Sequence, residues 1–238
     1  LAYTFSDSFW FSAVEGEVYA MSSFFTAITF WCILKWEEVA DKPHSARWLV
    51  FIAYLIGLSV GVHLLSLLTI PAMGMIYYFK NNEYSHKGAF KAFAVSTVIL
   101  FFIQLVVIPK TASLMGAFDV YFVNSLNMPF NSGLIVYFLL LIGLITFGLI
   151  YSKQNGKPHL NTAILSFLVL LIGYSSYSVL VVRSASNPPI DEGNPENALT
   201  LTSYLERDQY GDWPIFSGYY YSDRPTSIKN GNPIYEKN

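Results

Sequence analysis

Two carboxylates, Glu15 and Glu17, stand two residues apart in the segment "FWFSAVEGEVYAMSSFF", directly before an apolar run. Paired acids of this kind can bind a hydroxyl group or a metal ion, or act as general acid and base. Acids in the first turn of a helix also offset its dipole, by about 0.3–1 kcal/mol each, so a structural role is an equal alternative. Residues two apart on a helix diverge by about 200°, so both can face one cavity only where the backbone is not helical. Gly16 between them permits such a break.

His63 and Arg183 are the basic residues whose surroundings suggest a ligand. His63 lies in an apolar segment beside Gly57 and Gly61. A lone histidine there more often forms a hydrogen bond between packed helices, although an imidazole can also bind a phosphate oxygen or a sugar hydroxyl. Arg183 ends the last apolar run, where it either reaches lipid headgroups or holds a phosphate in its guanidinium fork.

Acidic residues continue after Arg183. Asp191, Glu192 and Glu196 form either a carboxylate cluster or a solvated acidic loop. Asp119 falls in a predicted loop over residues 110–131, where it is a weaker candidate. The chain has no Walker A sequence, Rossmann glycine fingerprint, HExxH motif or nucleophile elbow, which argues against the soluble nucleotide enzymes.

The composition decides what kind of element must position these residues. Of the 238 residues, 53% are hydrophobic and 13% are charged, whereas soluble domains carry about 25% charged residues. Several apolar runs reach the length that crosses a bilayer, so we predict an all-α, multi-pass membrane protein. The net charge of -2 argues against a nucleic-acid partner, and the single cysteine, Cys32, excludes a disulfide framework and a cysteine metal site.

Six transmembrane helices are predicted, because the long apolar stretch over residues 47–80 is divided at Gly61–His63. This division places the connections 35–47, 80–91 and 153–157 on one side, with eight of the fourteen lysines and arginines. Such asymmetry marks the cytoplasmic side. Glu15, Glu17, His63, the 110–131 loop and the tail then lie on the other side. The predicted spans are about 18–36, 47–61, 64–80, 92–109, 132–152 and 161–182.

The domain organisation follows from a change in composition after the last span. Residues 1–182 form the predicted transmembrane domain, and residues 183–238 form an external tail of mixed or irregular structure, rich in Pro, Asn and Gly. Within it, the segment "ENALTLTSYLERDQY" is predicted to contain a short helix. The chain begins without Met and without a signal peptide, and we interpret it as an internal piece of a longer protein.

Three segments together resemble one family: "DSFWFSAVEGEVYAMSSFFTAITFWCILKWEE", "RWLVFIAYLIGLSVGVHLLSLLTIPA" and "RSASNPPIDEGNPENALTLTSYLERDQYGDWP". They are similar to a bacterial multi-pass membrane family catalogued as a domain of unknown function. That family resembles the animal transmembrane protein O-mannosyltransferase and is grouped with the GT-C-fold glycosyltransferases. The resemblance covers nearly the whole chain, in the same order and at similar spacing.

The resemblance implies a partial GT-C-like core whose donor is a polyprenyl-phosphate sugar and whose acceptor is a Ser or Thr of an exported protein. It also implies that the general base lies upstream of this chain, so Glu15 and Glu17 are expected to support the site. His63, Arg183, Asn187 and Glu192 are the expected substrate-binding residues. A divalent metal ion is left open. The expected location is the bacterial inner membrane, with membrane lipid as a partner.

Two other functions remain alternatives. A transporter or flippase would use the same broken helices and intramembrane polar groups, and an inverted repeat between the two halves, which the sequence lacks, would favour it. A non-catalytic membrane anchor of a surface-assembly complex would tolerate changes at Glu15 and Glu17 freely.

Overall fold

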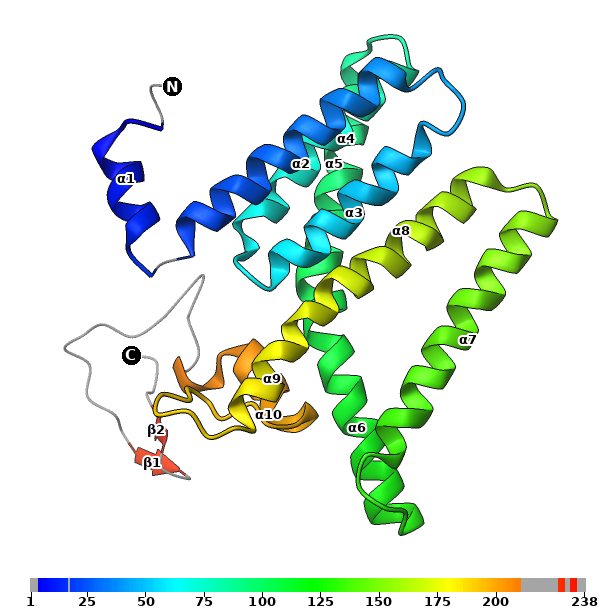
Figure 1. The fold of residues 1–238 in the computed structure, drawn as a ribbon. Helices are drawn as coiled ribbons and strands as arrows, with labels where there is room; N and C mark the ends of the chain where they lie inside the picture. The colour runs from blue at the N-terminus through cyan, green and yellow to red at the C-terminus, as the bar shows by residue number, and fades with distance from the viewer. Residues whose placement is uncertain (1–3, 17, 211–226, 230–231, 235–238) are drawn as a thin grey trace. The chain divides into compact units, whose positions relative to one another are not determined.

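The computed structural model describes residues 4–16, 18–210, 227–229 and 232–234. Residues 1–206 form one compact unit and residues 207–238 a second, smaller one. Figure 1 shows that the first unit is built from helices. In chain order these are α1 (Asp7–Val14), α2 (Tyr19–Val39), α3 (Ala46–Val60), η1 (Leu64–Leu68), α4 (Thr69–Asn81), α5 (His86–Phe102), η2 (Ile103–Val107), α6 (Ile108–Leu126), α7 (Ser132–Gln154), α8 (Pro158–Tyr174), η3 (Ser175–Tyr177), α9 (Ser178–Ser184) and α10 (Ala198–Glu206).

The length and composition of the helices are those of a membrane protein. Three continuous helices in the described chain are long and apolar enough to cross a bilayer: His86–Leu126, Ser132–Gln154 and Pro158–Ser184. A shorter apolar helix covers Ala46–Val60. A helix of about 20 residues spans the hydrocarbon core, so each of the three is sufficient. The other predicted spans fall on α2, α3 and η1–α4, and six crossings stay a prediction.

The helical path breaks at Gly61–His63, the place where the sequence predicts a turn. Gly61 caps the C-terminal end of α3, and the backbone of His63 is extended, with φ of -166°. The amide of His63 donates to the carbonyl of Ser59 at 2.8 Å, which closes the last turn of α3. The chain then reverses its direction between α3 and α4 (Figure 1).

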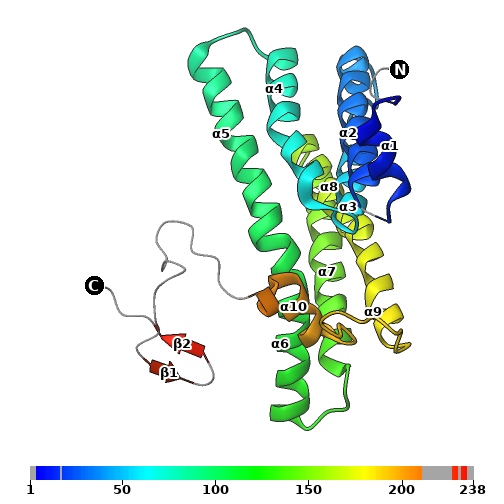
Figure 2. The ribbon, with the colours of Figure 1, turned by 90° about the vertical axis from the view of Figure 1, so that its left-hand side faces the viewer.

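The predicted loop over residues 110–131 is wrong for most of its length. Residues 108–126 are helical, and α5, η2 and α6 form one continuous 41-residue helix (Figure 2). The π-helical turn η2 ends two residues before Pro109 and accommodates its missing N–H. α6 buries Ala112 and Gly116, and this packing stabilises the helix beyond Pro109 although the segment contains polar residues. Apolar periodicity does not reveal such a tertiary contribution. The loop is confined to 127–131, between two asparagines in the left-handed conformation.

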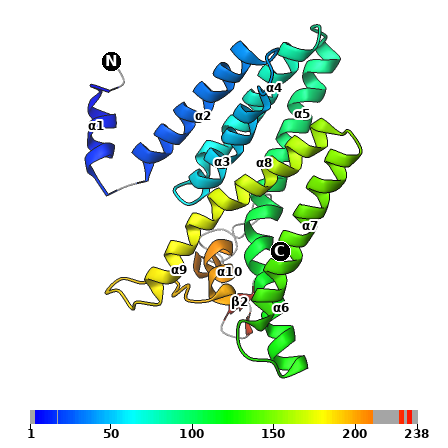
Figure 3. The ribbon, with the colours of Figure 1, turned by 45° about the vertical axis from the view of Figure 1, so that its right-hand side comes forward.

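The closest helix contact in the first unit is the crossing of α3 and α8. A methyl group on Gly57 would lie 2.2 Å from the carbonyl oxygen of Leu170, and one on Gly173 would lie 2.5 Å from that of Tyr54. Two facing glycines therefore let the two backbones touch, as small residues do at helix interfaces in membranes. Figure 3 shows α8 crossing α3 along this contact.

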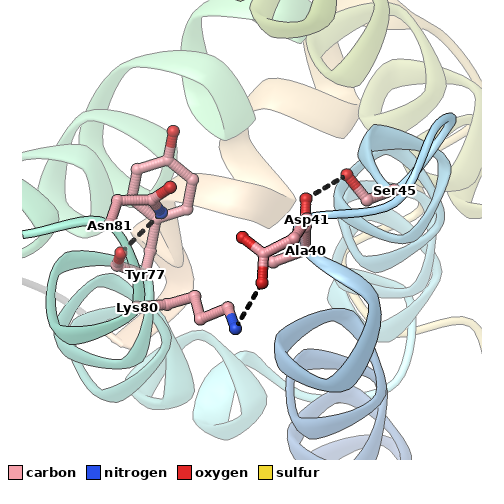
Figure 4. Close-up of polar contacts among 6 residues, drawn as sticks. All are labelled: Ala40, Asp41, Ser45, Tyr77, Lys80 and Asn81. Atoms are coloured by element: carbon pink, nitrogen blue, oxygen red, sulfur yellow. Dashed lines mark hydrogen bonds and ion pairs between the residues drawn. The ribbon is translucent and has the colours of Figure 1, made fainter.

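The end of the first unit opposite the α3–α4 turn carries the basic connections. Lys80 at the end of α4 forms an ion pair with Asp41 in the α2–α3 connection, with Nζ and Oδ2 2.9 Å apart (Figure 4). In the same connection, Ser45 donates its hydroxyl to the carbonyl of Ala40 at 2.9 Å. These contacts join the ends of α2, α3 and α4. The alternating helix directions leave the start of α2, the α3–α4 turn, the α6–α7 loop and α9 at the other end (Figure 1).

The tail after Arg183 begins as part of the first unit. The predicted short helix is present as α10, and its Leu201 is buried against the transmembrane helices. The second unit contains η4 (Asp208–Tyr210) and an antiparallel pair of short strands, β1 (Ser227–Lys229) and β2 (Asn232–Ile234). The guanidinium of Arg207 lies 4.9 Å from the centroid of the Tyr210 ring.

We expect Gly57→Ala to destabilise the folded protein by roughly 1–3 kcal/mol, because its methyl group would overlap the backbone of α8. The measurement is thermal unfolding of the purified protein in detergent. Gly143→Ala is the matched control, since nothing lies within 4 Å of the position its methyl group would occupy. Equal melting temperatures for the two variants would contradict the glycine-mediated crossing.

The direction of the helices is tested with cysteines placed at opposite ends of the first unit. Ser125 and Gln154 are both exposed, and the predicted orientation places Ser125 outside and Gln154 in the cytoplasm. A membrane-impermeant thiol reagent added to intact cells is therefore expected to label Ser125→Cys and not Gln154→Cys. The native Cys32 is fully buried and serves as the unreactive background. The reverse labelling pattern would overturn the orientation.

Candidate functional site

His63 is held at the break between α3 and α4 by a hydrogen bond of its own ring. Its Nδ1 accepts the backbone N–H of Leu65 at 3.1 Å, so the side chain caps the N-terminus of η1. The neutral ring then carries its proton on Nε2, which leaves that N–H as a donor. The ring is half-buried, and its centroid lies 5.9 Å from that of Tyr19, the first residue of α2.

A chain of buried hydroxyl groups stabilises this turn. Ser66 Oγ donates to Ser59 Oγ at 2.5 Å, and Ser59 Oγ donates to the carbonyl of Ile56 at 2.7 Å. Thr69 Oγ1 donates to the carbonyl of Ser66 at 2.7 Å. These bonds give each of the three buried hydroxyls a partner, so none of them is left unpaired in an apolar environment. The turn is therefore a built feature of the fold.

Glu15 lies between α1 and α2, in non-helical backbone. A cavity shared by Glu15 and Glu17 requires such a break in the helix. It caps the C-terminal end of α1 with extended backbone (ψ of 150°), and its side chain is exposed. A negative charge at this end of a helix opposes the helix dipole, so dipole stabilisation does not explain Glu15. Glu17 lies outside the described residues. Tyr19 begins α2 two residues later and connects this segment to His63 through the ring contact.

Arg183 and Glu192 line one hollow, which has a volume of about 160 Å³. Arg183 is exposed near the end of α9, and Glu192 comes from the loop that follows. The hollow is also lined by Leu180, Ser184, Pro188, Ile190, Asp191 and Tyr204. It combines a guanidinium, two carboxylates, a hydroxyl and a phenol, a set that can bind a phosphate at the cation and sugar hydroxyls at the acids.

The loop that forms the hollow is fixed by Ser184, the last residue of α9. Its buried hydroxyl donates to Asp191 Oδ2 at 2.8 Å. Asn194 Oδ1 lies 3.3 Å from the same Ser184 Oγ. Asn187 turns the chain in the left-handed conformation, with φ of 49°, and its amide donates to the carbonyl of Ser184 at 2.9 Å. Asn187 is exposed and does not line the hollow, so the structure gives it a turn-forming position.

The His63 turn and the Arg183 hollow are connected through η3. A methyl group on Gly61 would lie 3.1 Å from Ser176 Oγ and 3.8 Å from the ring of Tyr177. Arg183 follows Tyr177 by six residues, which is about 9 Å along a helix axis. The structure therefore places both groups at the same end of the first unit, joined by the helical segment η3–α9.

The contribution of Ser184 and Tyr204 to this region was not predicted from the sequence. Only the spacing of serine and aspartate in "SASNPPID" could have suggested the contribution of Ser184. The predicted carboxylate cluster is divided, because Asp191 and Glu192 line the hollow while Glu196 lines a different cavity. Within the described residues, no group of three His, Cys, Asp or Glu side chains lies close enough to hold a metal ion.

Asp119, predicted to lie on a loop, is instead part of α6. Its carboxylate accepts the N–H of Gly133 at 3.2 Å, at the start of α7. Gly133 packs so closely on α6 that a methyl group there would lie 2.3 Å from the carbonyl oxygen of Phe118. Asp119 therefore closes the α6–α7 hairpin by pairing with the N-terminus of a helix, a structural position.

Residues 1–86 match the family model described as Protein O-mannosyl-transferase TMEM260 N-terminal domain. The matched region contains Glu15 and the His63 turn and ends at the start of α5, before the Arg183 hollow. No curated protein and no solved structure matches the chain. The similarity to an O-mannosyltransferase family thus concerns about the first third of the chain.

The capping bond of His63 yields a test that separates a structural from a binding role. We expect His63→Ala to lower the stability by about 0.5–2 kcal/mol, because the N–H of Leu65 loses its acceptor. His63→Asn should restore most of this loss, since an asparagine oxygen can accept the same N–H. Thermal unfolding in detergent measures both. An alanine variant as stable as the unmodified protein would show that the cap contributes nothing.

Proposed function

We propose that this chain is part of a membrane glycosyltransferase that transfers a sugar, mannose, from a polyprenyl-phosphate donor to Ser or Thr of exported proteins. The observation that carries the proposal is the match of residues 1–86 to the protein O-mannosyl-transferase family model. The apolar helices support a lipid-linked donor, because such a donor must be reached from within the bilayer. The resemblance of the tail segment "RSASNPPIDEGNPENALTLTSYLERDQYGDWP" to the same kind of protein extends the proposal to the Arg183 hollow.

Transfer of a sugar requires a base at the acceptor hydroxyl and stabilisation of the departing lipid phosphate. In the proposal, Arg183 binds that phosphate through its guanidinium fork, and the free Nε2–H of His63 donates to a phosphate or sugar oxygen. Glu192 accepts from sugar hydroxyls in the hollow, and Glu15 and Glu17 position the acceptor or the sugar. The proposal assigns the general base to no residue of this chain.

The proposed reaction takes place outside the cytoplasm, at the outer leaflet of a bacterial inner membrane. The basic connections around Lys80 and Asp41 are at one end of the first unit, and the α3–α4 turn and α9, which carry His63 and Arg183, lie at the other. Lysines and arginines favour the cytoplasmic side, so the site faces outward. Exported proteins present their hydroxyl groups on this side, which fits an exported acceptor.

Arg183→Lys in the full-length protein is expected to lower kcat/KM for sugar transfer by roughly ten- to a hundredfold. Lysine keeps the positive charge but cannot make the paired hydrogen bonds of the guanidinium, each worth about 1.5–3 kcal/mol to a charged partner. The assay measures transfer from polyprenyl-phosphate mannose to a peptide in membranes. Arg47→Lys, an exposed arginine at the opposite end, is the control and should retain full activity.

Glu15→Gln in the same assay should also reduce transfer, while Glu83→Gln, an exposed acid in the α4–α5 connection, should not. Unchanged transfer by both Arg183→Lys and Glu15→Gln would remove the site assignment. Transport of a lipid-linked sugar across vesicles without any transfer to peptide would favour the transporter alternative and contradict the enzyme.

A further inference from the structure

A second cavity, separate from the Arg183 hollow, lies between α6, α7, the α8–η3–α9 helix and the start of α10. Its volume is about 370 Å³. Aliphatic and aromatic residues, including two tyrosines, make up eleven of its seventeen lining residues. α7 forms one wall, and only 6% of its most apolar window is buried, the lowest share among the three long apolar helices. Within a bilayer that surface is covered by lipid, so the cavity is accessible to lipid chains.

Three of the hydroxyl groups in the wall already donate to carbonyls within the protein. Tyr174 Oη donates to the carbonyl of Ile108 at 3.0 Å, Ser175 Oγ to that of Ile172 at 2.7 Å, and Thr111 Oγ1 to that of Val107 at 2.5 Å. These groups have no donor left to offer a sugar or another polar solute. The interior therefore suits a hydrocarbon chain.

The extent of the cavity along α7 corresponds to one leaflet. The lining residues on α7 run from its N-terminal end inward, from Leu134 through Phe138 to Leu141, with Asn131 just before the helix. Ten residues from Asn131 to Leu141 rise about 15 Å, half of the hydrocarbon core of about 30 Å. A lipid chain from the leaflet at the tail end fits this depth.

The rim of the cavity carries a negative charge. Glu196 lines it, and no lysine, arginine or histidine of the described chain is among the lining residues. Glu196 forms no ion pair within 4.0 Å with any other described residue. A carboxylate at the rim repels an anionic headgroup and attracts an ammonium group that can donate hydrogen bonds to it.

We propose that this cavity binds one acyl chain of a phosphatidylethanolamine-type lipid, with its primary ammonium group against Glu196. The site goes beyond the proposed glycosyltransferase function. The proposed donor is an anionic phosphate, and Arg183 lies on the other face of α9: Ser178, Val181 and Val182 line the cavity, whereas Leu180, Arg183 and Ser184 line the hollow. One helix thus separates a site for an anionic lipid headgroup from a site for an ammonium headgroup.

The occupancy of the cavity is tested by native mass spectrometry of the full-length protein in detergent with added lipid. Leu141→Trp fills the inner end of the cavity and should reduce bound phosphatidylethanolamine at least fivefold. Leu144→Trp, an exposed position of α7 outside the cavity, is the matched control and should bind like the unmodified protein. Equal binding by the two variants, at equal melting temperatures, would overturn the proposal.

The headgroup is tested with Glu196→Gln, which leaves the volume of the side chain nearly unchanged. The unmodified protein should prefer phosphatidylethanolamine over phosphatidylglycerol by about two- to fivefold, the range for an exposed ion pair, and Glu196→Gln should abolish that preference. Glu206→Gln, an exposed acid of α10 that does not line the cavity, should retain it. A stronger preference for phosphatidylglycerol or polyprenyl phosphate at this site would contradict the ammonium headgroup. Because no assay here measures sugar transfer, the outcome is independent of the proposed enzyme activity.

Discussion

The crossing of α3 and α8 is the contact on which the arrangement of the polar groups depends. Gly57 and Gly173 allow the two backbones to approach within van der Waals distance. Lipid tails are as apolar as leucine, so helices in a bilayer associate through such close packing and not through the hydrophobic effect. The same crossing brings Gly61, at the end of α3, against Ser176 and Tyr177 of η3. The turn that presents His63 and the helix that presents Arg183 are therefore placed by one pair of glycines.

Broken backbone near a membrane requires that every freed polar group find a partner. At the α3–α4 turn the partners are side chains of the turn itself: the ring of His63 accepts one amide, and the Ser59 and Ser66 hydroxyls pair with each other and with the backbone. At the end of α9 the single hydroxyl of Ser184 holds the following loop through Asp191. Both polar sites are thus attached to rigid helix ends by buried serines, which is the kind of support that fixes the geometry of a binding group.

The sequence predicted those features that depend on local pattern. The asymmetric distribution of lysine and arginine, together with Gly61, indicated the turn at His63, and the spacing of Leu201 and Leu205 indicated the helix in the tail. The continuation of α6 to Leu126 could not be predicted, because its polar surface is stabilised by burial of Ala112 and Gly116. The bond from Ser184 to Asp191 spans seven residues without secondary structure, and no periodicity reports such a contact.

The helix α9 has only seven residues, yet its two faces contact surroundings of opposite character. One face contributes Arg183 to a small polar hollow, and the other contributes Val181 and Val182 to an apolar cavity with Glu196 at its rim. In the two proposals, the ammonium group of one lipid pairs with Glu196 and the anionic phosphate of the other pairs with Arg183, and each of these two groups would meet a like charge at the other site. Binding of the two proposed lipids at separate sites requires such a distinction. The separation of charge across α9 provides it without any additional element of the fold.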